Sequence, residues 1–212
     1  MPTINKWTGV GVDVQTALAS ALTITAISKA SEAVITATNS LTAGGYVLII
    51  CNGMNQMNYR VVRVKTPTGT NFVAEGVDST NFDTFTSGTA QLITFGASAS
   101  TFVDVNMSGG EAESIDVTTV HDTVKKEIPG AKSAVSVAIS SLWDPTDAAL
   151  VQLKAADDVG AIRAIQLRFT SGARVLFAAY PSAPLLPTGS TGDKVQTPVS
   201  LKLAGPAQAY ST

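Results

Sequence analysis

The chain has 212 residues, which suits one large β domain or two small ones and is long enough to bury a substantial core. Only 14% of the residues are charged, the net charge is −2 and the isoelectric point lies near 5.3, which argues against a dedicated nucleic-acid-binding protein. Mean hydropathy is +0.24, so we expect part of the surface to be buried against other subunits, because large apolar patches usually mark interfaces.

Cysteine usage and the apolar runs indicate the compartment. The single cysteine, Cys51, excludes an intramolecular disulfide and indicates synthesis in a reducing compartment. The first residues do not combine a charged segment with an apolar one, so no secretory signal is expected. No apolar run approaches the ~18 residues of a membrane span. We therefore expect no membrane insertion.

The first half of the chain is expected to hold an arm and a small β module. Residues 1–21 show no strong period and are expected to form an extended or loosely helical N-terminal arm. Residues 22–95 are expected to form the module, because short alternating segments are separated by Gly, Asn and Pro. The expected strands cover residues 22–28, 32–38, 46–51, 59–65 and 70–75.

Residues 96–212 form a second group with its own strand pattern. Residues 121–133 are polar and mixed in charge, and are expected to form a long loop. Residues 171–173 are expected to form a hairpin turn. The expected strands cover residues 101–107, 114–120, 134–140, 162–170, 174–180 and 195–203.

One helix is expected, at about residues 145–156. Asp144 can cap its N-terminus, Pro145 fits the first helical position and Asp147 lies in the first turn. Residues 157–158 are both aspartates and oppose the dipole at the C-terminal end, so the helix is expected to stop before them. The predicted fold class is all-β with one helix: a two-sheet, barrel-like sandwich preceded by the small module.

The second group resembles the tail tube proteins of siphophages, which are bacteriophages with long non-contractile tails. The resemblance covers roughly half of the chain. It is carried by Leu-Trp-Asp-Pro at residues 142–145, the helix, Arg-Phe-Thr at 168–170, Arg-Val-Leu-Phe at 174–177 and a last strand at 194–203. It implies a sandwich with the helix packed on it, and sixfold rings that stack into a tube for the genome.

Residues 24–90 resemble a different small β module, which occurs in many phage structural proteins and is distantly similar to an insert domain of ubiquitin-activating enzymes. The family normally has Gly where Tyr59 stands, so the turn there is expected to differ. This resemblance implies a virion component and no ubiquitin chemistry. The residues that carry it are Ile24, Ala26, Ile27, residues 34–36, Gly45, Val47, Ile49, residues 54–58, Val61, Val64, Thr70, Phe72, residues 76–80, Ser87 and Gly88.

The tail tube resemblance also implies partners and a location. The chain is expected to form a homo-oligomeric ring and then a stacked tube. Tape-measure, tail-tip and terminator proteins of the tail are the expected partners, and viral DNA passes without specific binding. The expected location is the virion tail, after assembly in the host bacterial cytoplasm. No cofactor is expected.

Five polar residues are candidates for lining the lumen: Asp104, Asn106, Glu111, Glu113 and Asp116. On a strand, Asp104 and Asn106 alternate to one face, and so do Ser114 and Asp116. Unpaired acidic groups on such a face would repel duplex DNA, which carries a negative charge every ~1.7 Å. The same alternation fits an ordinary solvent-facing surface equally well.

The segment of residues 121–132 mixes positive and negative charges, which suits contact with a neighbouring ring because complementary charges fix the register. In the resembling family this long loop mediates ring stacking. The stacking candidates are His121, Asp122, Lys125, Lys126, Glu127 and Lys132.

Two groups of residues are candidates for catalysis. Cys51 and His121 could act as nucleophile and base, but Cys51 ends an apolar strand and fits a buried position better. Glu111, Glu113 and Asp116 could hydrolyse a glycoside, but no aromatic platform for a sugar lies nearby. His121 is the only histidine, so no histidine-based metal cluster can form.

No enzymatic activity, catalytic residue or metal site is therefore expected. A different class of function stays open as the alternative, namely a phage decoration protein or a receptor- or carbohydrate-binding β module. Filament growth that depends on protein concentration would distinguish a tube protein from such a binding module.

Overall fold

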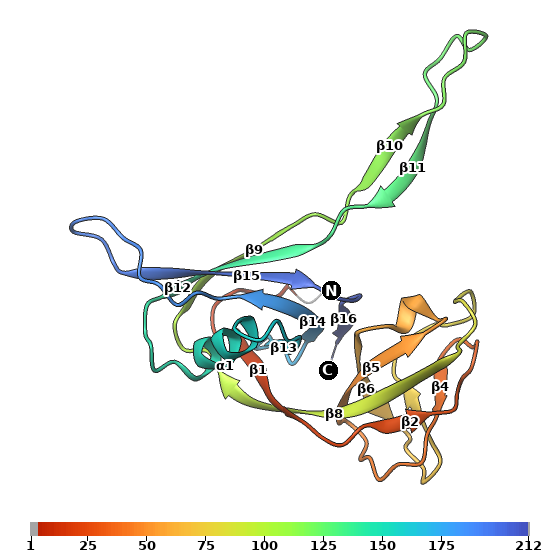
Figure 1. Ribbon diagram of the computed structural model, residues 1–212, viewed down its shortest axis with the longest axis horizontal. Helices are drawn as coiled ribbons and strands as arrows, with labels where there is room; N and C mark the ends of the chain where they lie inside the picture. Colours follow the sequence, from red (N-terminus) through yellow and green to blue (C-terminus); the bar gives the residue numbers. More distant parts are fainter. Residues whose placement is uncertain (1–3, 212) are drawn as a thin grey trace.

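A computed structural model describes residues 4–211, which form sixteen strands, one α-helix and one short 3-10 helix (Figure 1). One continuous sheet runs in the order β3-β4-β7-β6-β5-β8-β1-β13-β14-β15-β12-β9, with β2 added to β8 and β16 to β14. A separate two-stranded sheet, β10 with β11, projects from the body. The predicted fold class, all-β with one helix, is confirmed.

The small β module contains six strands and the first half of a seventh. Its core holds Ile35, Ile49, Met57 and Phe72, all completely buried. The 3-10 helix, Asn55–Met57, lies in the turn after β5. The strands are β2 (Leu22–Ile24), β3 (Ala26–Ile27), β4 (Ala33–Thr36), β5 (Tyr46–Asn52), β6 (Arg60–Lys65), β7 (Asn71–Ala74) and β8 (Ser87–Ser98).

β8 joins the module to the rest of the protein. Its first half pairs with β5 and β2, and its second half pairs with β1 (Gly11–Leu18). Leu18 lies opposite Ile93, and the Ala19 amide donates to the Leu92 carbonyl at 2.9 Å. The module is therefore inserted between two strands that pair directly with each other.

β1 is the main difference from the expected N-terminal arm. Residues 11–18 form a central strand, with β8 on one edge and β13 on the other. Val12 and Val14 are buried in the core, and the Asp13 carboxylate pairs with the Arg168 guanidinium. Tertiary pairing with two segments far away in the sequence creates this strand, so local periodicity did not predict it. Residues 1–3 of the expected arm lie outside the described residues.

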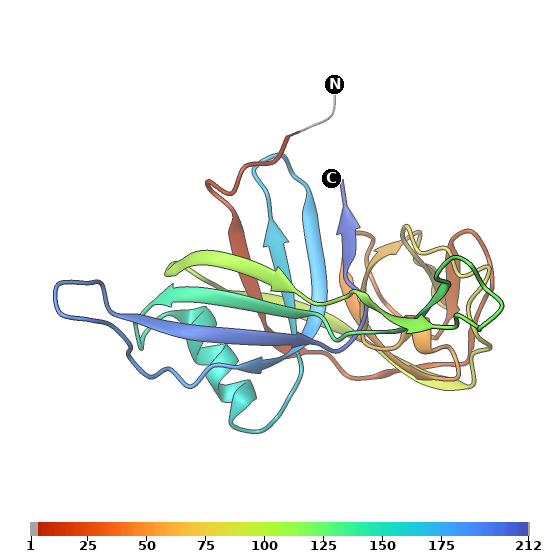
Figure 2. The same ribbon diagram turned by 90° about the horizontal axis from the view of Figure 1, so that it is seen from above.

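The sandwich domain is formed by the rest of the sheet. β14 pairs with β15 only through Ala179–Ser182, so the sheet folds over at this point. In Figure 2, β9, β12 and β15 cross in front of β13 and β14. The core between the layers includes Val14, Ile165, Phe177 and Leu201. The strands are β9 (Phe102–Ser108), β12 (Ser136–Leu142), β13 (Arg163–Arg168), β14 (Arg174–Ser182), β15 (Gln196–Leu203) and β16 (Gln208–Tyr210).

The helix α1, Ala148–Asp157, starts and ends later than expected. Asp147 is its N-cap, because its carboxylate accepts hydrogen bonds from the Ala149 and Leu150 amides. Asp144 instead closes a local turn by accepting from the amide and hydroxyl of Thr146. The helix includes Asp157, whose carboxylate accepts from the Ala183 amide at 2.8 Å. This tertiary hydrogen bond offsets the unfavourable position of Asp157 in the helix dipole.

The expected long loop of residues 121–133 is partly a strand. β11 (Glu127–Lys132) pairs with β10 (Ala112–Asp116), and the two form the projecting hairpin, defined here as residues 109–134 (Figure 1). Pro129 and Gly130 indicated a loop, but a two-stranded ribbon accepts proline at an edge position, where its nitrogen needs no partner. Pro129 lies opposite Ser114.

The module packs against the outer face of β13 and β14. The shared cluster contains Leu48 and Val61 from the module together with Ala164, Leu176 and Ala178 from the sandwich. The contact covers the apolar outer face of this part of the sheet.

The polar C-terminus contains a further strand, β16, which holds the module in place. The Arg63 amide donates to the Tyr210 hydroxyl at 2.7 Å, and the Arg63 guanidinium lies 4.6 Å from the centre of the Tyr210 ring. Burial raises the pKa of Tyr210 to about 12, so the hydroxyl stays protonated at neutral pH.

Candidate functional site: a polar sheet face and a projecting hairpin

The outer face of β9, β12 and β15 is lined by small polar side chains in three cross-strand rows. Alternation along β12 buries Val137 and Ile139 in the core and turns the residues between them outward. The same alternation on β15 buries Val199 and Leu201. The rows are Asp104–Ser140–Pro198, Asn106–Ala138–Ser200 and Ser108–Ser136–Lys202, and these nine residues are called the polar face.

Most side chains of the polar face are short, and its net charge is close to zero. It carries one carboxylate, Asp104, and one ammonium group, Lys202. The Asp104 carboxylate accepts a hydrogen bond from the Asn106 side-chain amide at 2.6 Å, so its charge is partly satisfied within the face. Such a surface offers neither a cluster of cations for phosphate nor aromatic rings for bases or sugars.

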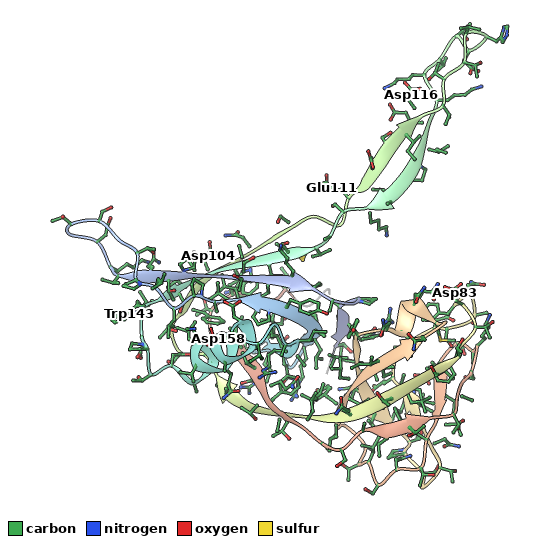
Figure 3. All side chains as sticks on the ribbon, viewed as in Figure 1. Asp83, Asp104, Glu111, Asp116, Trp143 and Asp158 are labelled. Atoms are coloured by element: carbon green, nitrogen blue, oxygen red, sulfur yellow. The ribbon has the colours of Figure 1, made fainter. Side chains whose placement is uncertain are left out.

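The five expected lumen residues are not gathered on one surface. Asp104 and Asn106 share the polar face, as the alternation predicted. Glu113 and Asp116 lie on β10, and Glu111 lies in the connection between β9 and β10. Figure 3 shows Asp104 over the sandwich, Glu111 at the base of the hairpin and Asp116 far along it.

The hairpin also carries the six stacking candidates, and its charges are largely paired. Lys125 pairs with Glu127, and its ammonium lies 3.9 Å from the Asp116 carboxylate. Lys126 pairs with Asp122 and lowers the pKa of that carboxyl. The lysines of these pairs are exposed, so each pair contributes little to stability. The other two candidates are His121 and Lys132. His121 lies in the loop at the hairpin tip, and Lys132 lies on β11, opposite Ala112 of β10.

Exposed apolar side chains accompany these charges. Val120 at the tip of the hairpin is 96% exposed, and Val124 is also largely exposed. Ile115 and Ile128 face each other across the two strands, and both are exposed. A ribbon that shows this much apolar surface is typical of an interface.

The two candidate catalytic residues, Cys51 and His121, do not form a site. Cys51 is buried in the module, its thiol donates to the Met54 carbonyl at 3.3 Å, and burial raises its pKa. His121 belongs to the separate hairpin. Within residues 4–211, no group of three or more His, Cys, Asp or Glu residues is placed to hold a metal ion. The same part of the chain contains no helix with the length and apolar character to cross a membrane.

Comparison with known proteins places the chain in a family. A solved structure described as "Tail of empty GTA particle computed with helical refinement, C6 symmetry" is similar, with 16% identity and a TM-score of 0.43, over 56% of this chain and 86% of that chain. No curated protein sequence matches the chain significantly. The family model for the phage tail tube protein, TTP, matches residues 52–212, which is well over half of the chain. The resemblance seen in the sequence is confirmed, and the chain belongs to the phage tail tube protein family.

Proposed function

We propose that the protein is a non-enzymatic structural subunit that forms hexameric rings, that these rings stack into the tail tube, and that the polar face lines the lumen. The lumen assignment rests on the difference in polarity between two outer faces of the sheet. The outer face of β13 and β14 is apolar and covered by the module, whereas the outer face of β9, β12 and β15 is polar and uncovered.

A DNA conduit needs a lining that neither grips nor blocks the duplex. DNA carries a negative charge every ~1.7 Å, so closely spaced lysines or arginines would hold it. The polar face has a single carboxylate and a single ammonium group per subunit, and serine or alanine at its centre. Short side chains leave the passage wide, and balanced charge lets DNA pass without specific binding.

Ring closure would use the free edge of the sheet. β9 is the last strand in the sheet order and pairs with β12 alone among the described strands. Its unpaired main-chain groups can pair with a different edge of the next subunit, which is the heterologous contact that closes into a ring. The hairpin would then contact the neighbouring ring through its stacking candidates.

Family membership supports a structural role in the virion tail and does not favour a decoration protein or a carbohydrate-binding module. The finer assignments belong to the same proposal. Tape-measure, tail-tip and terminator proteins would contact the ends and interior of the tube, and assembly would take place in the host cytoplasm.

The assembly and the lining can be tested together. Purified wild-type protein is expected to form rings or hollow tubes at high concentration in electron micrographs, with six subunits in end-on views. Ala138→Lys places a cation at the centre of the polar face, so its tubes should form but retain duplex DNA in a sedimentation assay. Retention should fall steeply between about 50 and 200 mM salt, because phosphate contacts release counterions.

Thr70→Lys is the matched control, because it adds the same charge at an exposed position of the module. Its tubes should retain no more DNA than wild type. Small isolated particles of wild-type protein at every concentration would contradict the tube, whereas equal DNA retention by the two lysine variants would contradict the lining alone.

We further propose that the module lies on the outside of the tube. None of its residues from 22 to 86 is among the exposed large hydrophobic side chains, so its surface suits solvent rather than a subunit interface. Gly69→Cys should react with a bulky maleimide in both free subunits and tubes, because open space surrounds Gly69.

Ser140→Cys should react in free subunits and be protected in tubes when the maleimide is coupled to a protein that is wider than duplex DNA, because such a reagent cannot enter a passage sized for the duplex. The native Cys51 is buried and should not interfere. Protection of Gly69→Cys in tubes, or full labelling of Ser140→Cys, would contradict this arrangement.

A further inference from the structure

An apolar cavity of about 240 Å³ lies between the two layers of the sandwich, at the end where β13 turns into β14. It is called the slot, and its walls include Ile139, Leu167, Val175 and Phe177. Trp7 also lines the slot and is 60% exposed, so its indole stands at the mouth. A cavity of about 150 Å³ lined by Leu, Ile and Phe accepts benzene, so the slot is large enough for an indole.

The segment that carries Trp7, residues 4–10, precedes β1 and belongs to no strand. The Trp7 ring lies 5.7 Å from the Phe169 ring, and the Asn5 side-chain oxygen accepts a hydrogen bond from the serine hydroxyl in the turn after β13. Figure 2 shows the segment beside this turn. Gly9 has a φ of +76°, a left-handed conformation that glycine adopts without strain. Trp7 can therefore turn about Gly9 without the loss of a strand pair.

Trp7 also lines a second cavity, which follows the free edge of β9. This cavity, called the groove, has a volume of about 210 Å³ and lies between Trp7, Val10 and Val12 on one side and residues 102–105 on the other. Side chains alternate between the faces of a strand, so a cavity bordered by four consecutive residues lies along the strand edge. β9 pairs with β12 alone among the described strands, so its other edge is the one that ring closure would use.

A strand of a second copy that pairs with β9 would lie about 4.8 Å from it and would run through the groove. The Trp7 indole stands in its path, and the slot is the apolar cavity on the other side of the same side chain. We propose that Trp7 is a plug: when a second copy pairs with β9, the indole leaves the groove and turns into the slot, an inference that rests on the ring closure proposed above. The neighbour binds only the plugged conformation, so ring closure and completion of the core are coupled.

The movement of the indole can be followed by fluorescence. Trp143→Phe leaves Trp7 as the sole tryptophan of the chain. Acrylamide should quench Trp7 strongly in dilute subunits, and in tubes the quenching should fall severalfold while the emission shifts to shorter wavelengths. Equal quenching in subunits and tubes would overturn the plug. A shift that persists in tubes when Val175→Phe fills the slot would also overturn it, because the neighbour rather than the slot would then cover the indole.

Two substitutions that fill and empty the slot provide the decisive test. Trp7→Ala removes the plug, and Val175→Phe fills the slot so that the indole cannot leave the groove. Each should raise the critical concentration for tube growth by at least about tenfold. The double variant should return to within about threefold of wild type, because the slot is filled and no indole blocks the edge. Thermal unfolding of dilute subunits should show that each variant is folded.

Val151→Phe is the matched control, because it adds the same ring at a position of α1 that is 41% exposed and lines neither cavity. It should not rescue Trp7→Ala. The plug is overturned, while the tube function stands, if either single variant assembles like wild type, if the double variant is no better than the worse single variant, or if Val151→Phe rescues equally well. If wild-type protein forms neither rings nor tubes, the tube function itself fails, and the plug fails with it.

Discussion

Asp147→Ala is expected to lower the free energy of unfolding by about 3 kcal/mol, because it removes an N-cap and leaves buried donors without partners. Asp147 is only 4% exposed. One carboxylate oxygen accepts from the Ala149 and Leu150 amides at 3.0 and 3.1 Å. The other accepts from the Ser100 amide at 2.9 Å, the Ser100 hydroxyl at 2.8 Å and the Thr101 hydroxyl at 3.1 Å. One side chain thus ties the helix to the turn between β8 and β9.

The same carboxylate should make stability depend on pH. Burial raises the pKa of Asp147, but the hydrogen bonds from Ser100, Leu150 and Thr101 outweigh it, so the net pKa is lowered. A lowered folded-state pKa stabilises the fold above the unfolded value, near pH ~4, and this contribution is lost as pH falls further. Urea unfolding of dilute subunits at neutral pH and near pH 3 should show that the difference between wild type and Asp147→Ala shrinks in acid.

Asp144→Ala is the control for this prediction. Asp144 accepts from the Thr146 amide at 2.8 Å and hydroxyl at 2.7 Å in a local turn, and it is not completely buried. Its loss should cost less than about 1 kcal/mol. A cost as large as that of Asp147→Ala would show that the helix is not anchored through Asp147.

These two aspartates show what the sequence could and could not predict. Both stand before the helix and both are good caps, so local pattern favoured Asp144 followed by proline. Ser100 and Thr101, which are distant in sequence, decide which aspartate caps the helix. They donate hydrogen bonds to Asp147 and not to Asp144. Strands with strong alternation, such as the one at residues 134–140, were predicted within two residues. β1 was missed because its partners are β8 and β13 rather than a neighbouring hairpin.

Local sequence pattern also predicted only part of the candidate site. Alternation was sufficient to place Asp104 and Asn106 on one face. Ser140, Ala138 and Ser200 were missed, because small side chains give no local functional signal and join the face only through the register of three strands. The acidic residues after Gly109 carry a clear charge signal, but β9 ends at Ser108, before that glycine, and these residues belong to the hairpin instead of the polar face.

Gly109→Ala is expected to abolish tube growth while leaving the sandwich folded. Gly109 has a φ of +87°, and a Cβ there would lie 2.2 Å from the Ala134 carbonyl oxygen, so the backbone must move. It stands where β9 ends and the hairpin begins, next to Gly110, whose amide donates to the Ser133 carbonyl at 3.2 Å. Relief of the clash should redirect the hairpin away from the neighbouring ring. Sedimentation and electron microscopy would measure tube growth, and thermal unfolding of dilute subunits would report the fold.

Gly44→Ala separates the direction of the hairpin from simple backbone strain. Gly44 has a φ of +83°, but nothing lies within 4 Å of the Cβ that alanine would add. This variant should lose about 1 kcal/mol of stability from left-handed strain and still form tubes. Tubes from Gly109→Ala at the wild-type critical concentration would show that the hairpin need not be held in one direction. A defect confined to Gly109→Ala would instead show that tube growth depends on the direction in which Gly109 and Gly110 set the hairpin. The sandwich and its polar face are the same in both variants, so neither could explain the difference.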